Sequence, residues 1–424
     1  RSAAALEIPP LTAFDALLKT SGEGREFSTT MAFVRILNIL IKDKVLGSRI
    51  VPIVPDESRT FGMEGMFRQL GIWNQLGQLY TPQDADQLMF YKESKTGQIL
   101  QEGINEPGAI ADWIAAATAY STHGVQMLPV YICYSMFGMQ RTMDLVWAAA
   151  DQRSRGFLIG ATAGRTTLNG EGLQHADGHS HVFSSVVPNC ISYDPTFGYE
   201  VAVIVQDGLR RMFAEQEDVF YYLTVMNENY EHPQMPAGET ITADIIKGMY
   251  LFRKGAASNS PRVQLLGSGS IFREAIAAAE LLKQDWDVDA DLWSCPSFTE
   301  LARDGQDCIR WNLLHPDNKQ RTPHVTACLA DTRGPVIAAT DYIRLFAEQI
   351  RPYVPRACTV LGTDGFGRSD TRAKLRHFFE VDRHWITLAA LRALADDGQI
   401  EAKKPGEAIV KYGLDPDKPN PTKV

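Results

Sequence analysis

Short apolar runs rich in β-branched and aromatic residues alternate with amphipathic stretches, and this alternation constrains the fold more than any other feature of the chain. Such runs, bounded by turn residues and separated by helical patterns, indicate the buried strands and crossover helices of parallel sheets. One helical pattern, STTMAFVRILNILIKDK, has Ser28 or Thr29 as its predicted cap. Five strands are predicted before residue 226: RIVPIVP (49–55), MLPVYICYS (127–135), GFLIGAT (156–162), NCISYD (189–194) and VFYYLTV (219–225).

A stretch containing Pro and Gly, YEHPQMPAGE (230–239), indicates a crossing to a second unit of the same class. The second unit begins at VQLLGSGS, and a closing helical region is predicted over residues 372–397. Between them lie a predicted helix, IFREAIAAAELLKQ (271–284), and three predicted strands, VDADLWSC (288–295), GPVIAAT (334–340) and CTVLGTD (358–364). The sequence therefore predicts an α/β fold with mostly parallel sheets.

Composition excludes several classes of function. The net charge of -9 arises from interspersed charges, so no basic stripe is available to follow a nucleic-acid backbone. No uninterrupted apolar run reaches the roughly 18 residues of a membrane span, so we expect no membrane insertion. The six cysteines lie in apolar segments without CxxC pairs, which favours a reducing cytoplasm. Because the chain begins with Arg1, we interpret it as part of a longer protein or as a mature product.

Two glycine-rich motifs lie at predicted strand ends. LLGSGSIF has Phe272 where the third glycine of a dinucleotide fingerprint would stand, so a tight strand-to-helix turn is the favoured interpretation. LGTDGFGRSD lacks the GK[ST] ending of a phosphate loop. We interpret it as a shaped loop at the end of a strand, where functional surfaces of α/β folds lie.

The segment HADGHSH supplies His175, His179 and His181. A zinc site is one interpretation, but the segment has no nearby Cys or Glu-x-x-His partner. A single histidine acting as acid, base or hydrogen-bond donor is favoured, because imidazole titrates near neutrality. We therefore predict no metal site in these residues.

Carboxylates stand in two apolar contexts. Asp56 and Glu57 follow a predicted strand, where they can serve a ligand crevice, cap a helix or pair with Arg59. Glu102 and Glu106 lie between QIL and WIAAATAY, where a charge is costly unless something pairs with it. Glu106 is either a first-turn carboxylate favoured by the helix dipole or the partner of a basic ring nitrogen from a ligand.

The motifs resemble the transketolase-like family of thiamine diphosphate enzymes. Within that family, the whole chain is similar to the C-terminal half of the homodimeric class of pyruvate dehydrogenase components. The resemblance implies two three-layer α/β/α domains: a lead-in over residues 1–27, a pyrimidine-binding domain over 28–245 and a C-terminal domain over 246–424. The segments that carry it are DESRTFGMEGMFRQLGI, GQILQEGINE, YSMFGMQR, GRTTLNGEGLQHADGHSH, PNCISYDP, SFTELARDGQDC and GTDGFGRSD.

The same resemblance implies roles for individual residues. Glu106 would hydrogen-bond the ring nitrogen of the cofactor's aminopyrimidine and promote the tautomer that activates the cofactor. Phe137 would stack on the pyrimidine, Tyr134 would line its pocket, and Ile104 would support the bent cofactor. The other matching active-site positions are those of Arg141, Asp56, Glu57 and His175, the last near the reacting centre. His179 and His181 are predicted to be structural.

The chain departs from the family pattern in two respects. Pro107 follows Glu106 where an ordinary helix residue is expected, which alters the helix start but leaves the carboxylate. No GDG motif followed by an Asn is present, and that motif holds magnesium and the diphosphate in this family. We therefore expect Mg²⁺ and the diphosphate to be held by an N-terminal domain upstream of Arg1.

The resemblance implies an oxidoreductase that decarboxylates pyruvate and reductively acetylates the lipoyl group of dihydrolipoyl acetyltransferase. It also implies a homodimer in which this chain contributes the pyrimidine half of the site, so that the chain alone is inactive. Two alternatives stay open. One is a β-type subunit of a heterotetrameric 2-oxoacid dehydrogenase, and the other is a non-catalytic dimerisation or docking fragment.

Overall fold

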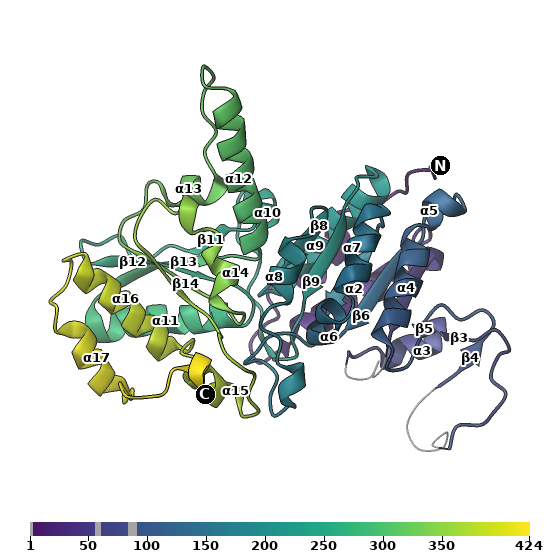
Figure 1. Ribbon diagram of the computed structural model, residues 1–424, viewed down its shortest axis with the longest axis horizontal. Coiled ribbons are helices and arrows are strands. Elements are labelled where there is room, and N and C mark those ends of the chain that lie inside the picture. Colours follow the sequence, from purple (N-terminus) through teal and green to yellow (C-terminus); the bar gives the residue numbers. More distant parts are fainter. Residues whose placement is uncertain (1–2, 56–60, 84–90) are drawn as a thin grey trace. The chain divides into compact units, whose positions relative to one another are not determined.

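The computed structural model describes residues 3–55, 61–83 and 91–424, and the chain divides into two compact units, each described by itself (Figure 1). Each unit is made of stretches that are separate along the chain. The predicted domain ranges stay predictions. The first unit comprises Arg1–Ala163, Phe183–Ser192 and Phe197–Met235, and the second comprises Gly164–Val182, Tyr193–Thr196 and Pro236–Val424.

The first unit is built on a six-stranded sheet with the strand order β5-β2-β6-β7-β9-β8. Each pairing from β5 to β9 in that order is parallel, as the alternation of strand and helix patterns predicts. All five predicted strands of this unit are present, and the apolar run QIL before Glu102 leads into the short β5. The strands are β2 (Ile50–Val54), β5 (Leu100–Gln101), β6 (Leu128–Cys133), β7 (Phe157–Gly160), β8 (Cys190–Tyr193) and β9 (Phe220–Thr224).

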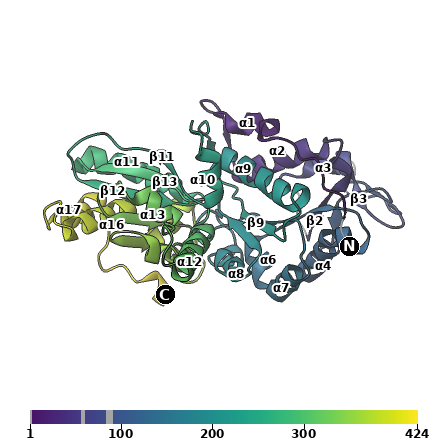
Figure 2. The ribbon, with the colours of Figure 1, turned by 90° about the horizontal axis from the view of Figure 1, so that it is seen from above.

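Helices cover both faces of this sheet, which makes the first unit three-layered. Figure 2 shows α2 (Thr29–Ile41) and α9 (Gly198–Leu209) on one face, and α4 (Glu106–Ala117) and α7 (Met143–Asp151) on the other. Ser28 caps α2, because its hydroxyl accepts a hydrogen bond from the Met31 amide at 3.1 Å. Smaller elements are η1 (Leu11–Phe14), α1 (Asp15–Leu18), α3 (Glu64–Leu70), α5 (Ala119–Thr122) and α6 (Ser135–Gln140), with the paired strands β1 (Glu26–Phe27) and β10 (Tyr230–Glu231), and β3 (Ile72–Trp73) and β4 (Glu93–Ser94).

The second unit has a five-stranded sheet with the order β11-β13-β12-β14-β15. The edge strand β11 is antiparallel to β13, whereas the remaining pairs are parallel. In Figure 1, α11 and α16 lie on one face of the sheet, and α12 and α13 on the other. The strands are β11 (Tyr250–Arg253), β12 (Arg262–Gly267), β13 (Asp289–Ser294), β14 (Val336–Ala339) and β15 (Cys358–Leu361), and the longer helices are α11 (Ile271–Trp286), α12 (Phe298–Leu314) and α16 (Arg383–Asp396), with the shorter α10 (Ile241–Lys247), α13 (His324–Leu329), α14 (Arg344–Glu348) and α17 (Lys404–Tyr412).

The predicted closing helical region is two helices, α15 (Arg372–Phe378) and α16. The break has a local cause: Glu380 has a φ of 63°, which a continuous helix does not allow. Asp382 then caps α16, because its Oδ1 accepts hydrogen bonds from the amides of His384 at 2.9 Å and Trp385 at 3.0 Å.

The glycine motif between β12 and α11 forms a tight turn, as predicted. A Cβ at Gly269 would lie 2.5 Å from a carboxylate oxygen of Asp194, and a Cβ at Gly267 would lie 2.9 Å from the Cα of Phe272. The Ser268 hydroxyl in this turn donates to Asp194 Oδ2 at 2.8 Å. The turn is therefore occupied by the protein's own carboxylate, which favours the tight-turn interpretation over a dinucleotide site. The α/β fold with mostly parallel sheets is confirmed in both units.

Candidate functional site

Glu106 begins α4 at the carboxyl end of the parallel sheet of the first unit. β5 ends at Gln101, and the Asn105 side chain caps the helix by accepting from the Gly108 amide at 3.2 Å. Glu106 is 6% exposed although it carries an ionisable group. Ligand crevices of parallel sheets lie beyond the carboxyl ends of the strands, so this buried carboxylate stands where a functional group is expected.

Arg141 is the charged partner of Glu106. Its Nη1 lies 3.0 Å from Oε1 and 3.1 Å from Oε2 of the carboxylate. The two side chains differ in exposure, since that of Arg141 is 50% exposed and that of Glu106 8%. The ion pair offsets part of the free-energy cost of burying the carboxylate. Because Arg141 is half-exposed, the carboxylate that it contacts lies close to the surface. The sequence predicted both residues for the site, and the structure brings them together.

Aromatic side chains surround this ion pair. The Arg141 guanidinium lies over the Phe137 ring, 4.1 Å from its centroid. Tyr134, the residue before α6, meets Phe137 edge-on with centroids 6.2 Å apart, and Phe61 meets Tyr134 edge-on at 5.7 Å. The structure therefore brings Tyr134 and Phe137 to the same end of the sheet as Glu106, where β6 leads into α6.

Tyr131 was not predicted as part of this group. It lies in β6, is 1% exposed, and shares a strand face with Cys133. Burial, with the neighbouring Cys133 thiol and the charge of Glu106, raises the pKa of Tyr131, so its hydroxyl stays protonated. In the sequence this tyrosine looks like an ordinary core residue of an apolar strand. The only indication of another role is its hydroxyl group, toward the carboxyl end of that strand.

Ile104 lies in the turn before α4, and its large aliphatic side chain is 77% exposed. It is therefore available as an apolar contact for a ligand at Glu106. Asp56 and Glu57 lie outside the described residues.

The side chains at the start of α4 suit a flat, basic heteroaromatic ring. One buried carboxylate can accept a hydrogen bond from a ring nitrogen, Phe137 offers an aromatic face, and Ile104 offers exposed apolar surface. This set fits the aminopyrimidine of thiamine diphosphate. Among residues 3–55, 61–83 and 91–424, no group of three or more His, Cys, Asp or Glu is placed to hold a metal.

The three histidines belong to the second unit and differ from one another. His175 ends the short turn η3 (Leu173–His175) and is half-buried. Burial lowers the pKa of His179, which lies 3.8 Å from Asp177. His181 is fully buried between Phe346, whose ring stacks at 4.6 Å, and Tyr342, and burial lowers its pKa to about 3. His181 is therefore a neutral core residue at neutral pH.

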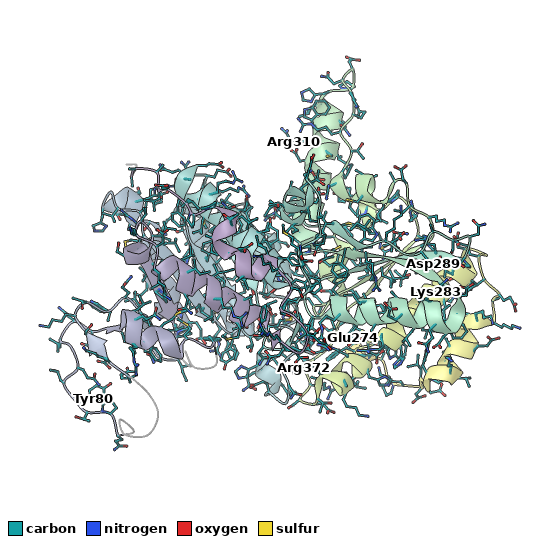
Figure 3. The ribbon with its side chains drawn as sticks, turned by 180° about the vertical axis from the view of Figure 1, so that it is seen from behind. Tyr80, Glu274, Lys283, Asp289, Arg310 and Arg372 are labelled. Carbon is teal, nitrogen blue, oxygen red and sulfur yellow. The ribbon has the colours of Figure 1, made fainter. Side chains whose placement is uncertain are left out.

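A buried polar cluster fixes the segment that carries these histidines. Asp341, which is 0% exposed, accepts hydrogen bonds from the Thr166 amide at 2.9 Å and from the hydroxyls of Thr166 and Thr167 at 2.6 and 2.7 Å. Figure 3 labels Arg372 on α15, whose Nε donates to the Thr167 carbonyl at 2.7 Å. The same view labels Glu274 on α11, which pairs with Arg383 at 2.9 Å. No local pattern in the sequence indicates this cluster.

All six cysteines lie within the described residues and are in the thiol form. Within the described residues, no helix combines the length and apolar character needed to cross a membrane.

Two families match the sequence. The family described as pyruvate dehydrogenase E1 component middle domain matches residues 6–233, and the family described as transketolase-like TK C-terminal domain matches residues 248–382. The chain is 74% identical over 425 residues to the pyruvate dehydrogenase E1 component of Cupriavidus necator, covering 100% of this chain and 47% of that protein. It is 57% identical over 418 residues to the protein of the same name from Escherichia coli K12, covering 98% of this chain and 46% of that protein. The chain thus spans about half the length of the curated relatives it matches.

Solved structures share the fold at low sequence identity. Transketolase from Leishmania mexicana is 17% identical, with a TM-score of 0.64, over 91% of this chain and 48% of that chain. A split gene transketolase, described as an inactive beta4 tetramer, is 14% identical, with a TM-score of 0.55, over 87% of this chain and 98% of that chain. At these identities the likeness shows a shared transketolase-like fold.

Proposed function

From the premise that the chain belongs to the pyruvate dehydrogenase E1 component family, we propose that it supplies the pyrimidine half of a thiamine diphosphate site. The complete enzyme decarboxylates pyruvate and reductively acetylates the lipoyl group of dihydrolipoyl acetyltransferase. The observation that carries this proposal is the buried carboxylate of Glu106 at the start of α4. Its partner Arg141 is half-exposed, and an aromatic face lies beside the pair.

Each residue near Glu106 has a proposed task. Glu106 accepts a hydrogen bond from the pyrimidine ring nitrogen and holds the proton at its carboxylate. Phe137 and Ile104 supply the aromatic and apolar contacts, Tyr134 lines the pocket, and Arg141 supplies the opposite charge. Thiamine diphosphate, when bound, supplies the electron sink for carbanion chemistry.

The remaining assignments rest on the resemblance to the family. We assign His175 a place near the reacting centre, and we assign Asp56 and Glu57 to the site as acidic residues. The diphosphate and Mg²⁺ belong to an N-terminal half, and the complete site forms in a homodimer that acts in the cytoplasm. The chain by itself is therefore inactive, which is in keeping with the description of the split gene transketolase as inactive.

The homodimeric class is favoured over a β-type subunit of a heterotetramer. The relatives of 74% and 57% identity are about twice the length of this chain, and its sequence matches about half of each of those single polypeptides. No specific observation favours a purely structural or docking role.

The test is Glu106→Gln in the full-length enzyme. Gln keeps the shape but cannot hold the proton, so we expect proton exchange at the thiazolium carbon of bound thiamine diphosphate to slow about 10²–10⁴-fold. Glu102→Gln is the matched control, because that exposed carboxylate lies in the same segment. Near wild-type exchange in Glu106→Gln would overturn the assignment.

A further inference from the structure

The turn that carries His175 packs without a gap on the loop over residues 362–370 of the same unit. A Cβ at Gly367 would lie 2.5 Å from the Cβ of Ala176 and 2.9 Å from the carbonyl oxygen of Leu173. The Gly170 amide donates to the carbonyl of Asp370 at 3.1 Å. The His175 turn and the loop therefore cannot both keep their places if Gly367 carries a side chain.

The buried Arg165 also links the segment that carries His175 to the loop over residues 362–370. It is 2% exposed, and its Nη1 donates to the carbonyls of Thr363, at 3.1 Å, and Gly365. Gly178 leaves room for the guanidinium, since a Cβ there would lie 2.3 Å from Nη2. Burial lowers the pKa of Arg165, but an arginine stays charged in proteins, so both hydrogen bonds are charge-assisted.

The C-terminal tail supports the same loop. Gly365 has a φ of 112°, and a Cβ there would lie 2.3 Å from the carbonyl oxygen of Pro421, which is buried. Lys418 anchors the tail, because its Nζ lies 2.9 Å from Glu380 and 5.2 Å from the centroid of the Phe378 ring. The loop is thus held by Arg165 from one segment and by Pro421 from another.

We propose that the loop over residues 362–370 is a positioning device for His175, with Arg165 and Gly367 as its positioning residues. His175 and Leu173 belong to one helical turn, which the 3.0 Å hydrogen bond from the His175 amide to the Gly172 carbonyl closes. Displacing the Leu173 carbonyl therefore displaces the imidazole. This inference rests on the proposed function, in which His175 lies near the reacting centre.

The first experiment follows the ring signals of His175 by NMR in the chain labelled with ¹³C-histidine. Gly367→Ala shifts these signals, because the new methyl group meets Ala176 and Leu173. The double variant Gly367→Ala, Ala176→Gly reduces the shift, since the closer contact, with the methyl group of Ala176, is gone while the contact with the Leu173 carbonyl remains. Gly406→Ala is the matched control: that glycine lies in the same unit, and a Cβ there meets nothing within 4 Å.

Arg165→Lys provides a second variant that retains the charge. A lysine ammonium lacks the planar fork of the guanidinium, so the His175 signals also shift while the chain stays folded. Unchanged His175 signals in both folded variants would overturn the inference.

The second experiment measures kcat and KM for pyruvate in the full-length enzyme. Gly367→Ala lowers kcat by about 10–100-fold, because small displacements of a reacting group have effects of this size. Adding Ala176→Gly in the same protein restores kcat in part. If the His175 signals shift while kcat stays unchanged, the assignment of His175 in the proposed function is wrong. The assignment of Glu106 is not affected by that result.

Discussion

Glu106 in the first unit and Asp341 in the second are both buried carboxylates, at 6% and 0% exposure, yet their surroundings differ in kind. Asp341 accepts three hydrogen bonds from Thr166 and Thr167, which belong to a segment folded over it. Within the described residues, only Arg141 donates to Glu106, and that arginine is half-exposed. The same cost of burial is met by three fixed donors and the charge of the buried Arg376 in one place, and by one half-exposed charge in the other.

The difference indicates which carboxylate serves structure and which serves a ligand. The Asp341 cluster continues to the Ser270 hydroxyl, 2.6 Å from that of Thr167, so that carboxylate holds its segment in place. Among the described residues, no donor other than Arg141 takes the remaining acceptor positions of Glu106. Burial raises the pKa of Asp341, while Arg376 and the two threonines act in the opposite direction.

The largest expected effect that sharpens this comparison is the loss of stability in Asp341→Ala. The substitution leaves three buried donors without their acceptor, and we expect the free energy of unfolding to fall by at least about 3 kcal/mol. Glu106→Gln should change it by less than about 1 kcal/mol, because the amide is isosteric and still accepts from Arg141. Denaturant unfolding of the two variants measures both. Equal losses would contradict the division of roles.

The strands and the unusual position of Glu106 depend on local pattern, whereas the role of Glu106 is implied only by the resemblance to the family. Apolar runs of strand length are read directly, and a charge between apolar elements is conspicuous. Asp341 and Thr166 are 175 residues apart, so nothing local connects them. Tyr131 is inconspicuous because the same apolar strand explains it. The antiparallel pairing of β11 also depends on tertiary contacts that the sequence pattern does not encode.

A smaller effect on the free energy of unfolding is expected when the pH is lowered. It arises from His181, which belongs to the segment that Asp341 holds in place. Burial lowers the pKa of His181 to about 3, against about 6.5 in an unfolded chain. Between these values the unfolded state binds the extra proton, so stability falls as pH is lowered, by up to about 1.4 kcal/mol per pH unit. In His181→Phe this contribution is absent. Unfolding of both proteins between pH 7 and pH 5 tests it, and parallel pH dependences would contradict the lowered pKa.

The smallest expected effect is that of Arg141→Gln on stability. Arg141 is half-exposed, its replacement can still donate to Glu106, and the start of α4 also favours negative charge. We therefore expect the free energy of unfolding to change by less than about 1 kcal/mol. Thermal unfolding measures it, and a loss as large as that of Asp341→Ala would place Glu106 among the structural carboxylates.

Titration calorimetry of this chain with thiamine diphosphate tests most directly the claim that Glu106 serves the pyrimidine while the diphosphate is held elsewhere. A single ring contact is a fragment-sized interaction that must overcome the entropy lost on association, so we expect a Kd weaker than about 0.1 mM. Binding should respond little to Mg²⁺ and be lost in Glu106→Gln. Tight, Mg²⁺-dependent binding that Glu106→Gln leaves unchanged would contradict the account.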